Sequence, residues 1–146
     1  MMRDKREIKI VIVEDDFYYN KLLLKYVETI CNESRYPGLS FRVASYLTAD
    51  RCLKDLKGDA DIMILDYYLK NSDGSETLNG EDILKAAHKL NPKTKVVMIS
   101  AQQNMLKAVE LMREGIYEYV DKNAHSGAKI GKILNEILTN EIRNQN

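Results

Sequence analysis

The sequence contains no tryptophan and only two prolines, two cysteines and two histidines in 146 residues. Cys31 and Cys52 lie in helix-like segments without metal-ligand spacing, which predicts two reduced thiols in a cytoplasmic protein rather than a disulfide or a zinc site. His88 and His125 are far from each other and from both cysteines, so no histidine-based metal site is expected. Any metal site in this chain must therefore use oxygen ligands.

The chain also lacks an excess of either charge and any long apolar run. Its 22 Lys and Arg residues balance 22 Asp and Glu residues, so no net field favours nucleic acid or anionic lipid. No apolar run approaches the roughly 20 residues of a membrane-spanning helix. The segment from Met1 to Glu7 is too charged to begin a secretory signal. We therefore expect a single domain that binds neither nucleic acid directly nor a membrane.

Short apolar runs alternate with longer segments of helical periodicity along the chain. Strands are expected at 8–13, 40–46, 61–65, 95–99 and 117–120, and helices at about 19–30, 48–57, 80–90, 103–114 and 130–138. The first, third and fourth strands are almost continuously apolar, as expected when helices cover both faces of a parallel sheet. The pattern predicts an α/β fold, with a doubly wound, flavodoxin-like parallel sheet of five strands in the order 2-1-3-4-5.

Some apolar and terminal residues are harder to place from periodicity alone. On the helix expected at 103–114, Met105, Leu106 and Met112 are interpreted as core residues rather than an interface. The polar end of the chain, from Asn140 to Asn146, is interpreted as a solvated terminus.

Polar side chains follow the central strands of the predicted sheet, at the point where each strand ends. In chain order they are Glu14, Asp15 and Asp16, then Asp66, then Ser100, and finally Lys122. In open α/β sheets, ligands bind outside the carboxyl ends of the strands, where the strand order switches. We therefore expect Asp66 to face Glu14 and Asp15, with Ser100 and Lys122 beside them.

The residue types in this group indicate phosphoryl chemistry assisted by a metal. Clustered carboxylates resist being ionised together unless a cation offsets their repulsion, and oxygen ligands favour Mg²⁺ or Mn²⁺. Asp66 stands apart from the Glu14–Asp15 pair and is the expected nucleophile, which would become an acyl phosphate. The alternative is that Glu14 to Asp16 simply form a solvated helix N-terminus, where the dipole favours acids. That alternative does not explain Asp66.

Four motifs follow the predicted strands in order: VIVEDD (11–16), IMILD (62–66), VMISA (97–101) and GIYEYVDK (115–122). Together they resemble a response-regulator receiver domain of two-component signalling. The resemblance runs over about 8–142 and implies a single receiver domain across residues 1–146. No output domain is visible.

The resemblance implies that Asp66 accepts a phosphoryl group from a phosphohistidine on a histidine kinase or a histidine phosphotransfer protein. Glu14, Asp15, Asp66 and the backbone carbonyl of Tyr68 would bind Mg²⁺ (or Mn²⁺). Asp16 would then cap the first helix instead of binding the metal. The product would be the modified protein itself, which makes the domain a signalling switch rather than an enzyme.

The same resemblance implies how the switch works. Ser100 would hydrogen-bond the phosphoryl oxygens, Lys122 would pair with them, and Tyr119 would change its side-chain position together with Ser100. The surface formed by the fourth helix, the fifth strand and the fifth helix would change as a result. A homodimer through this surface is also possible by resemblance.

The chain departs from the family pattern at three places. Asn123 follows Lys122 where receivers usually have proline, which puts a cis peptide at this bond in doubt. Lys70 occupies a second position that is commonly proline. The loop Lys70–Asn79 is longer than usual. It either reaches over the site or is a tolerated surface insertion, and we favour the insertion because loops accept length cheaply.

Two other functions fit parts of the sequence. A pseudo-receiver would keep the fold as a protein-interaction module without phosphoryl transfer; the missing proline and the long loop favour it, and the intact polar group opposes it. A phosphohydrolase on a similar sheet usually has a second acid two residues after its nucleophile, where this chain has Tyr68. The resemblance to receivers implies that Tyr68 and Gln102 flank the pocket, and the bulk of Tyr68 is expected to slow hydrolysis of an acyl phosphate.

Overall fold

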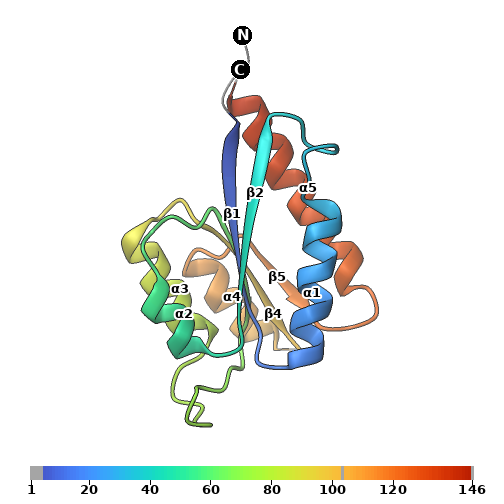
Figure 1. The fold of residues 1–146 in the computed structure, drawn as a ribbon. Helices are drawn as coiled ribbons and strands as arrows, with labels where there is room; N and C mark the ends of the chain where they lie inside the picture. Colours follow the sequence, from blue (N-terminus) through green and yellow to red (C-terminus); the bar gives the residue numbers. More distant parts are fainter. Residues whose placement is uncertain (1–4, 103, 146) are drawn as a thin grey trace.

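The computed structural model describes residues 5–102 and 104–145, and strands alternate with helices throughout them (Figure 1). The strands are β1 (Arg6–Val13), β2 (Leu39–Tyr46), β3 (Ile62–Asp66), β4 (Lys95–Ser100) and β5 (Glu118–Asp121). The helices are α1 (Phe17–Ile30), α2 (Ala49–Asp55), α3 (Gly80–Leu90), α4 (Met105–Arg113) and α5 (Ser126–Asn144).

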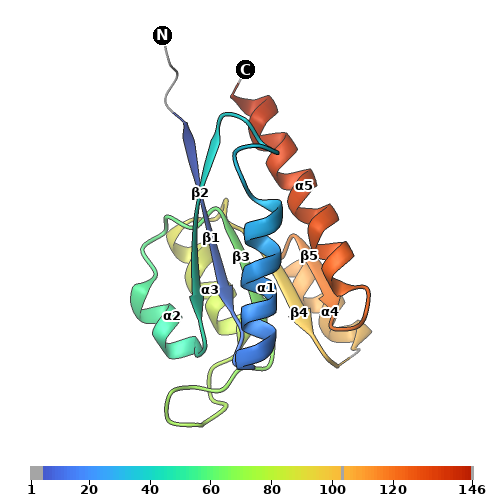
Figure 2. The same cartoon turned by 45° about the vertical axis from the view of Figure 1, so that its right-hand side comes forward.

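The five strands form one parallel sheet in the order β2-β1-β3-β4-β5, which confirms the predicted topology. Helices α1 and α5 cover one face, and α2, α3 and α4 cover the other (Figure 2). Every residue of β3 is buried because this strand lies at the centre of the sheet with helices on both faces.

The alternation of side chains along β1 divides the apolar core into two clusters. Ile10 and Ile12 pack with residues of α1 and α5. Val11 and Val13 point the other way and pack with residues of α2 and α3. The strand is therefore anchored on both faces, and its carboxyl end holds a defined position at the edge of the sheet.

Helix ends are specified by residues close to them in the chain. The N–H of Tyr19 donates to the Asp16 carboxylate at 3.0 Å, so Asp16 caps α1 as predicted. Asn79 and Asp82 form a reciprocal capping box at the start of α3. Gly115 has a φ of 101° and follows the end of α4, as expected for a glycine at this position.

Helix α3 begins very close to the end of β3. The N–H of Gly80 donates to the carbonyl of Tyr67 at 2.9 Å. A Cβ atom at Gly80 would lie 2.6 Å from the carbonyl oxygen of Asp66, a distance that no ordinary side chain tolerates. The absence of a side chain at position 80 therefore lets α3 pack directly against the residue that ends β3.

The prediction that the apolar residues of α4 belong to the core is wrong. Met105 and Leu106 are 84% and 85% exposed, Met112 is 50% exposed, and Leu111 is the buried residue of this helix. Periodicity identifies an apolar stripe, but α4 is short and presents only a narrow face to the sheet. The predicted helix start at Gln103 lies outside the described residues.

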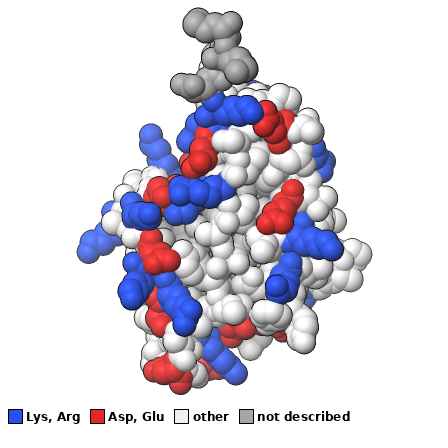
Figure 3. All heavy atoms as spheres, viewed as in Figure 1, with Lys and Arg blue, Asp and Glu red and all other residues white. Residues whose placement is uncertain are grey.

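The predicted solvated end of the chain is also partly wrong, because α5 continues to Asn144 and Ile142 packs on the core. Across residues 5–102 and 104–145, every helix is too short or too polar to cross a bilayer. Figure 3 shows Lys and Arg interspersed with Asp and Glu on the face that it presents, without a broad region of one sign.

Candidate functional site

Asp66 is the last residue of β3, and its carboxylate is nearly buried, with 4% of the residue exposed. Its Oδ1 accepts a hydrogen bond from the N–H of Tyr68 at 3.3 Å. Its Oδ2 accepts one from Nζ of Lys122 at 3.1 Å. Lys122 directly follows β5. Side chains at the ends of β3 and β5, which are not neighbours in the sheet, therefore meet at this carboxylate.

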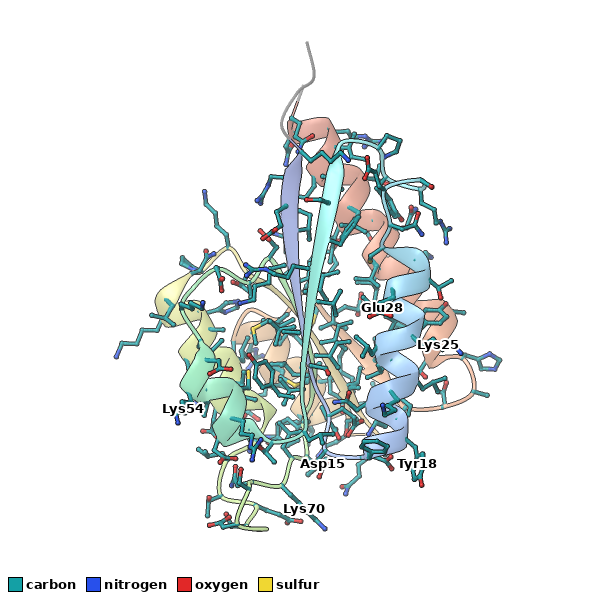
Figure 4. The ribbon with its side chains drawn as sticks, in the orientation of Figure 1. Asp15, Tyr18, Lys25, Glu28, Lys54 and Lys70 are labelled. Atoms are coloured by element: carbon teal, nitrogen blue, oxygen red, sulfur yellow. The ribbon has the colours of Figure 1, made fainter. Side chains whose placement is uncertain are left out.

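Glu14 and Asp15 lie beside Asp66, as the strand order predicts. Carboxylate oxygens of these three residues all lie within 4.8 Å of one another. Glu14 is fully buried and forms an ion pair with Lys122, while its Oε2 accepts a hydrogen bond from the N–H of Asp16 at 3.1 Å. Asp15 lies at the edge of the group, at the carboxyl end of the sheet (Figure 4).

Burial and the charges of neighbouring side chains shift the pKa values in this group. Burial, reinforced by the neighbouring Asp66, raises the pKa of Glu14 above its usual range. Burial and the adjacent Glu14 raise the pKa of Asp15 as well. Burial alone would lower the pKa of Lys122, but Glu14 and Asp66 outweigh it, and the pKa is raised. The lysine therefore stays charged while two carboxylates resist losing their protons.

The residues fit a divalent cation. In the part of the chain that the structure describes, three carboxylates cluster here and two of them pair with the Lys122 ammonium, which leaves an excess of two negative charges when all are ionised. Among residues 5–102 and 104–145, Oε1 of the buried Glu14 has no hydrogen-bond donor and forms an ion pair with the Lys122 ammonium. An all-oxygen donor set with an incompletely satisfied carboxylate suits Mg²⁺ or Mn²⁺. The carbonyl of Tyr68 remains a predicted ligand.

Ser100 and Tyr119 meet at the backbone of Gln102. Ser100 is fully buried at the end of β4, one residue beyond the partner of Asp66 in the β3–β4 ladder. Its hydroxyl oxygen accepts from the N–H of Gln102 at 3.2 Å. The half-buried Tyr119 of β5 donates its hydroxyl to the carbonyl of Gln102 at 3.2 Å. The two predicted switch residues are thus linked through one backbone segment.

The model of the response regulator receiver domain family matches residues 10–134 of this chain. The chain belongs to the response regulator receiver domain family. Searches of curated proteins find no match. The family membership agrees with the strand order of the sheet.

Solved structures of receivers share the fold. A receiver domain protein from Clostridium thermocellum is 18% identical with a TM-score of 0.71, and the match covers 92% of this chain and 96% of that one. The Thermotoga maritima response regulator DrrB, an OmpR/PhoB homolog, is 19% identical with a TM-score of 0.72. The match covers 92% of this chain and 54% of that one. The BeF3-activated DrrB receiver domain is 17% identical with a TM-score of 0.70, and coverage is 91% and 98%. At these identities the likeness shows the fold.

At Asn123, where the receiver departs from its family pattern, the chain forms a defined turn. Within the described residues every peptide bond is trans, including the bond after Lys122. The side chain of Asn123 accepts from the N–H of His125 at 2.8 Å, and its carbonyl accepts from the hydroxyl of Ser126 at 2.9 Å. Asn123 thus forms a hydrogen-bonded turn between β5 and α5.

The long loop Lys70–Asn79 contacts both the site and α2. The N–H of Lys70 donates to the Asp15 carboxylate at 3.2 Å, and both residues lie together in Figure 4. Further along, the N–H of Ser72 donates to Asp50 of α2 at 3.0 Å. Between these anchors Asn71 is buried and donates to Ser75 and Thr77. Of these hydrogen bonds, the one from Lys70 is the one that reaches the acidic group.

Two residues of α1 were not predicted as parts of the site. Asn20 is buried, and its amide donates to the carbonyls of Glu14 and Tyr46, both at 3.0 Å. The ring of Tyr19 lies against the ammonium of Lys122, with 4.6 Å between the nitrogen and the ring centroid. In the sequence, Tyr19 belongs to a helical apolar stripe and to a Tyr18–Tyr19 pair of the kind that is ordinary beside a cleft, and neither feature indicates a partner on another element.

Proposed function

We propose that this receiver is a phosphorylation-dependent signalling switch in which Asp66 accepts a phosphoryl group from a histidine kinase or a histidine phosphotransfer protein. The observation that carries the proposal is the position of the Asp66 carboxylate, nearly buried between the Lys122 ammonium and the Glu14–Asp15 pair. The trans Lys122–Asn123 bond and the long loop leave this arrangement intact.

The proposed reaction is a displacement at phosphorus. An oxygen of the Asp66 carboxylate attacks the phosphorus of the donor phosphohistidine, a P–O bond forms, and the P–N bond breaks. The imidazole leaves with the bonding electron pair and is protonated, and Asp66 becomes an acyl phosphate. Mg²⁺ held by Glu14, Asp15 and Asp66 would neutralise negative charge on the phosphoryl oxygens.

Residues of the chain supply the remaining positioning. Lys122 already contacts Oδ2 of Asp66, so its ammonium is placed to pair with oxygens of a phosphoryl group attached there. Ser100 would exchange its bond with Gln102 for one to a phosphoryl oxygen. Tyr119 shares the Gln102 segment, so this exchange would carry the change to the α4-β5-α5 surface, where an output protein or a second copy would bind.

The cellular setting is also a proposal. Cys31 and Cys52 are free and buried, and burial raises the pKa of each thiol to about 12. Two unreactive thiols are compatible with the cytoplasm, where a histidine kinase presents its phosphohistidine.

Phosphorylation by a small donor tests the proposed acceptor directly. The intact protein is incubated with acetyl phosphate and Mg²⁺, and its mass is compared with that of the Asp66→Asn variant. We expect one added phosphoryl group on the wild type and none on the variant or in the absence of Mg²⁺. Asp73→Asn, at an exposed aspartate in the long loop, is the matched control and should be phosphorylated like the wild type.

A negative result has a defined meaning. Beryllofluoride mimics the phosphoryl group and is not lost by hydrolysis, so its binding is measured in parallel. If neither a phosphoryl adduct nor beryllofluoride binding is detected, the switch proposal fails, and the protein is better described as a phosphorylation-independent interaction module. Steady turnover of a phosphate monoester that survives Asp66→Asn would favour neither the switch nor the interaction module.

A further inference from the structure

The Lys122 ammonium sits at the end of a flexible four-carbon chain, yet it is held at a defined point. Three groups surround its nitrogen: the carboxylate of Glu14, Oδ2 of Asp66 at 3.1 Å, and the ring of Tyr19 with its centroid at 4.6 Å. Only 17% of the lysine side chain is exposed. A cation over an aromatic face at this distance is attracted by the ring quadrupole, and more strongly where water is excluded.

Three contacts hold Tyr19 in place, one each through its backbone, its ring and its hydroxyl. Its backbone N–H is bound by the Asp16 cap, which fixes the first turn of α1. The ring packs against the apolar cluster between the sheet and α5. Its hydroxyl lies 3.1 Å from Oγ of Ser126, a buried residue at the start of α5. Tyr19 therefore has little freedom to move away from the lysine.

Hydrogen bonds connect the Tyr19 hydroxyl, through Ser126, to the residue that follows Lys122. The hydroxyl of Ser126 donates its single hydrogen to the carbonyl of Asn123 at 2.9 Å. The Tyr19 hydroxyl must then be the donor to Ser126. Because Asn123 directly follows Lys122, a closed circuit runs from the Lys122 backbone through Asn123 and Ser126 to Tyr19, and through the ring to the Lys122 ammonium.

We infer that Tyr19 is a positioning residue that holds the Lys122 ammonium against the Asp66 carboxylate through its ring face and its link to Ser126. This inference rests on the proposed function of Asp66. A ring face attracts the ammonium without offering a strong acceptor. Asp66 takes one of the three N–H donors of the ammonium and Glu14 faces it as an ion pair, so a donor stays available for a phosphoryl oxygen. A third carboxylate in place of the ring would occupy that donor.

Substitutions at position 19 separate the ring from the hydroxyl. The maximal rate of phosphorylation by acetyl phosphate at saturating Mg²⁺ is measured, together with the Mg²⁺ concentration that gives half of that rate. Tyr19→Leu should lower the maximal rate about fivefold and leave the half-saturating Mg²⁺ within about twofold. Tyr19→Phe keeps the ring and should retain most of the rate. Tyr18→Leu, at an 83% exposed tyrosine beside it, is the control and should change neither value.

A double-mutant cycle shows whether Tyr19 acts through Lys122. If it does, Tyr19→Leu adds no further loss in a Lys122→Met background. If the two losses multiply instead, Tyr19 is merely a core residue, and the inference is wrong. Fluorinated phenylalanines at position 19 preserve the ring shape and weaken its quadrupole, so they test the same contact should Tyr19→Leu not fold. The rate should fall with each added fluorine, and a constant rate overturns the inference.

A spectroscopic readout separates this inference from the proposed function. In the unphosphorylated wild type, the ε-methylene protons of Lys122 should resonate upfield because the ring shields them. The shift should persist in Tyr19→Phe and disappear in Tyr19→Leu. Its absence in the wild type overturns the positioning role. Failure of the wild type to be phosphorylated while the shift is present overturns the role of Asp66 alone.

Discussion

Replacing Gly80, the first residue of α3, with alanine should disturb the proposed phosphoryl-acceptor site at Asp66. The added Cβ would lie 2.6 Å from the carbonyl oxygen of Asp66, 2.7 Å from Sδ of Met98 and 3.0 Å from Cα of Tyr67. The Met98 side chain can rotate, but the other two atoms belong to the backbone at the end of β3. The start of α3 must therefore move away from the sheet, or Asp66 must move with its carboxylate.

The size of the effect follows from two opposing contributions. Forcing an extra methyl group into a packed contact costs about 1–3 kcal/mol. Alanine stabilises a helix interior by roughly 1 kcal/mol relative to glycine, and by less at the first helical residue, which Gly80 is. We expect a net loss of about 1–2 kcal/mol in the free energy of unfolding. Phosphorylation by acetyl phosphate should also slow, because Asp66 shifts relative to Lys122.

Urea unfolding followed by circular dichroism and phosphorylation followed by intact mass measure the two effects. Gly127→Ala is the matched control, since Gly127 also lies in the first turn of a helix and the nearest contact of its Cβ would be the Tyr26 ring at 3.5 Å. That variant should be as stable as the wild type or more stable by up to about 1 kcal/mol. If Gly80→Ala matches Gly127→Ala in stability and the wild type in rate, the close approach at Asp66 does not constrain the site.

Two further predictions concern the acidic group and the rim of the site. Burial, followed by the neighbouring Asp66, raises the pKa of Glu14 above its ordinary value of 4.5. The folding stability linked to the protonated form of Glu14 is therefore fully present below pH 4.5 and is lost as the pH rises through the raised pKa. Without Mg²⁺, Glu14→Gln should therefore gain stability relative to the wild type from about pH 4 to pH 8 in urea titrations, and a gap that does not change with pH would contradict this. Tyr68 is 44% exposed and packs edge-on against Tyr67, with ring centroids 4.8 Å apart, so it can restrict access of water. Tyr68→Ala should shorten the lifetime of the acyl phosphate about two- to fivefold, as measured by the loss of phosphorylated mass after the donor is removed; an equal lifetime would show that Tyr68 does not shield it.

The sequence was sufficient to predict the sheet and most of the polar group at its carboxyl edge, because both depend on short stretches of the chain. Runs such as Ile62 to Leu65 are apolar on both faces, which only a strand covered by helices on both sides tolerates, so the order of elements could be predicted. Residues that directly follow such strands must lie at the carboxyl edge. Glu14, Asp15 and Asp66 were therefore placed together correctly from their positions in the chain.

Only the tertiary structure decided which side chains meet across elements that are far apart in the sequence. Met105 and Leu106 have the periodicity of core residues, but α4 buries too narrow a face to cover them. Tyr19 has the same periodicity and becomes a neighbour of Lys122 because α1 and the β5–α5 turn pack at one edge of the sheet. Periodicity reports the average polarity of a helix face, whereas contacts depend on how much of that face another element covers.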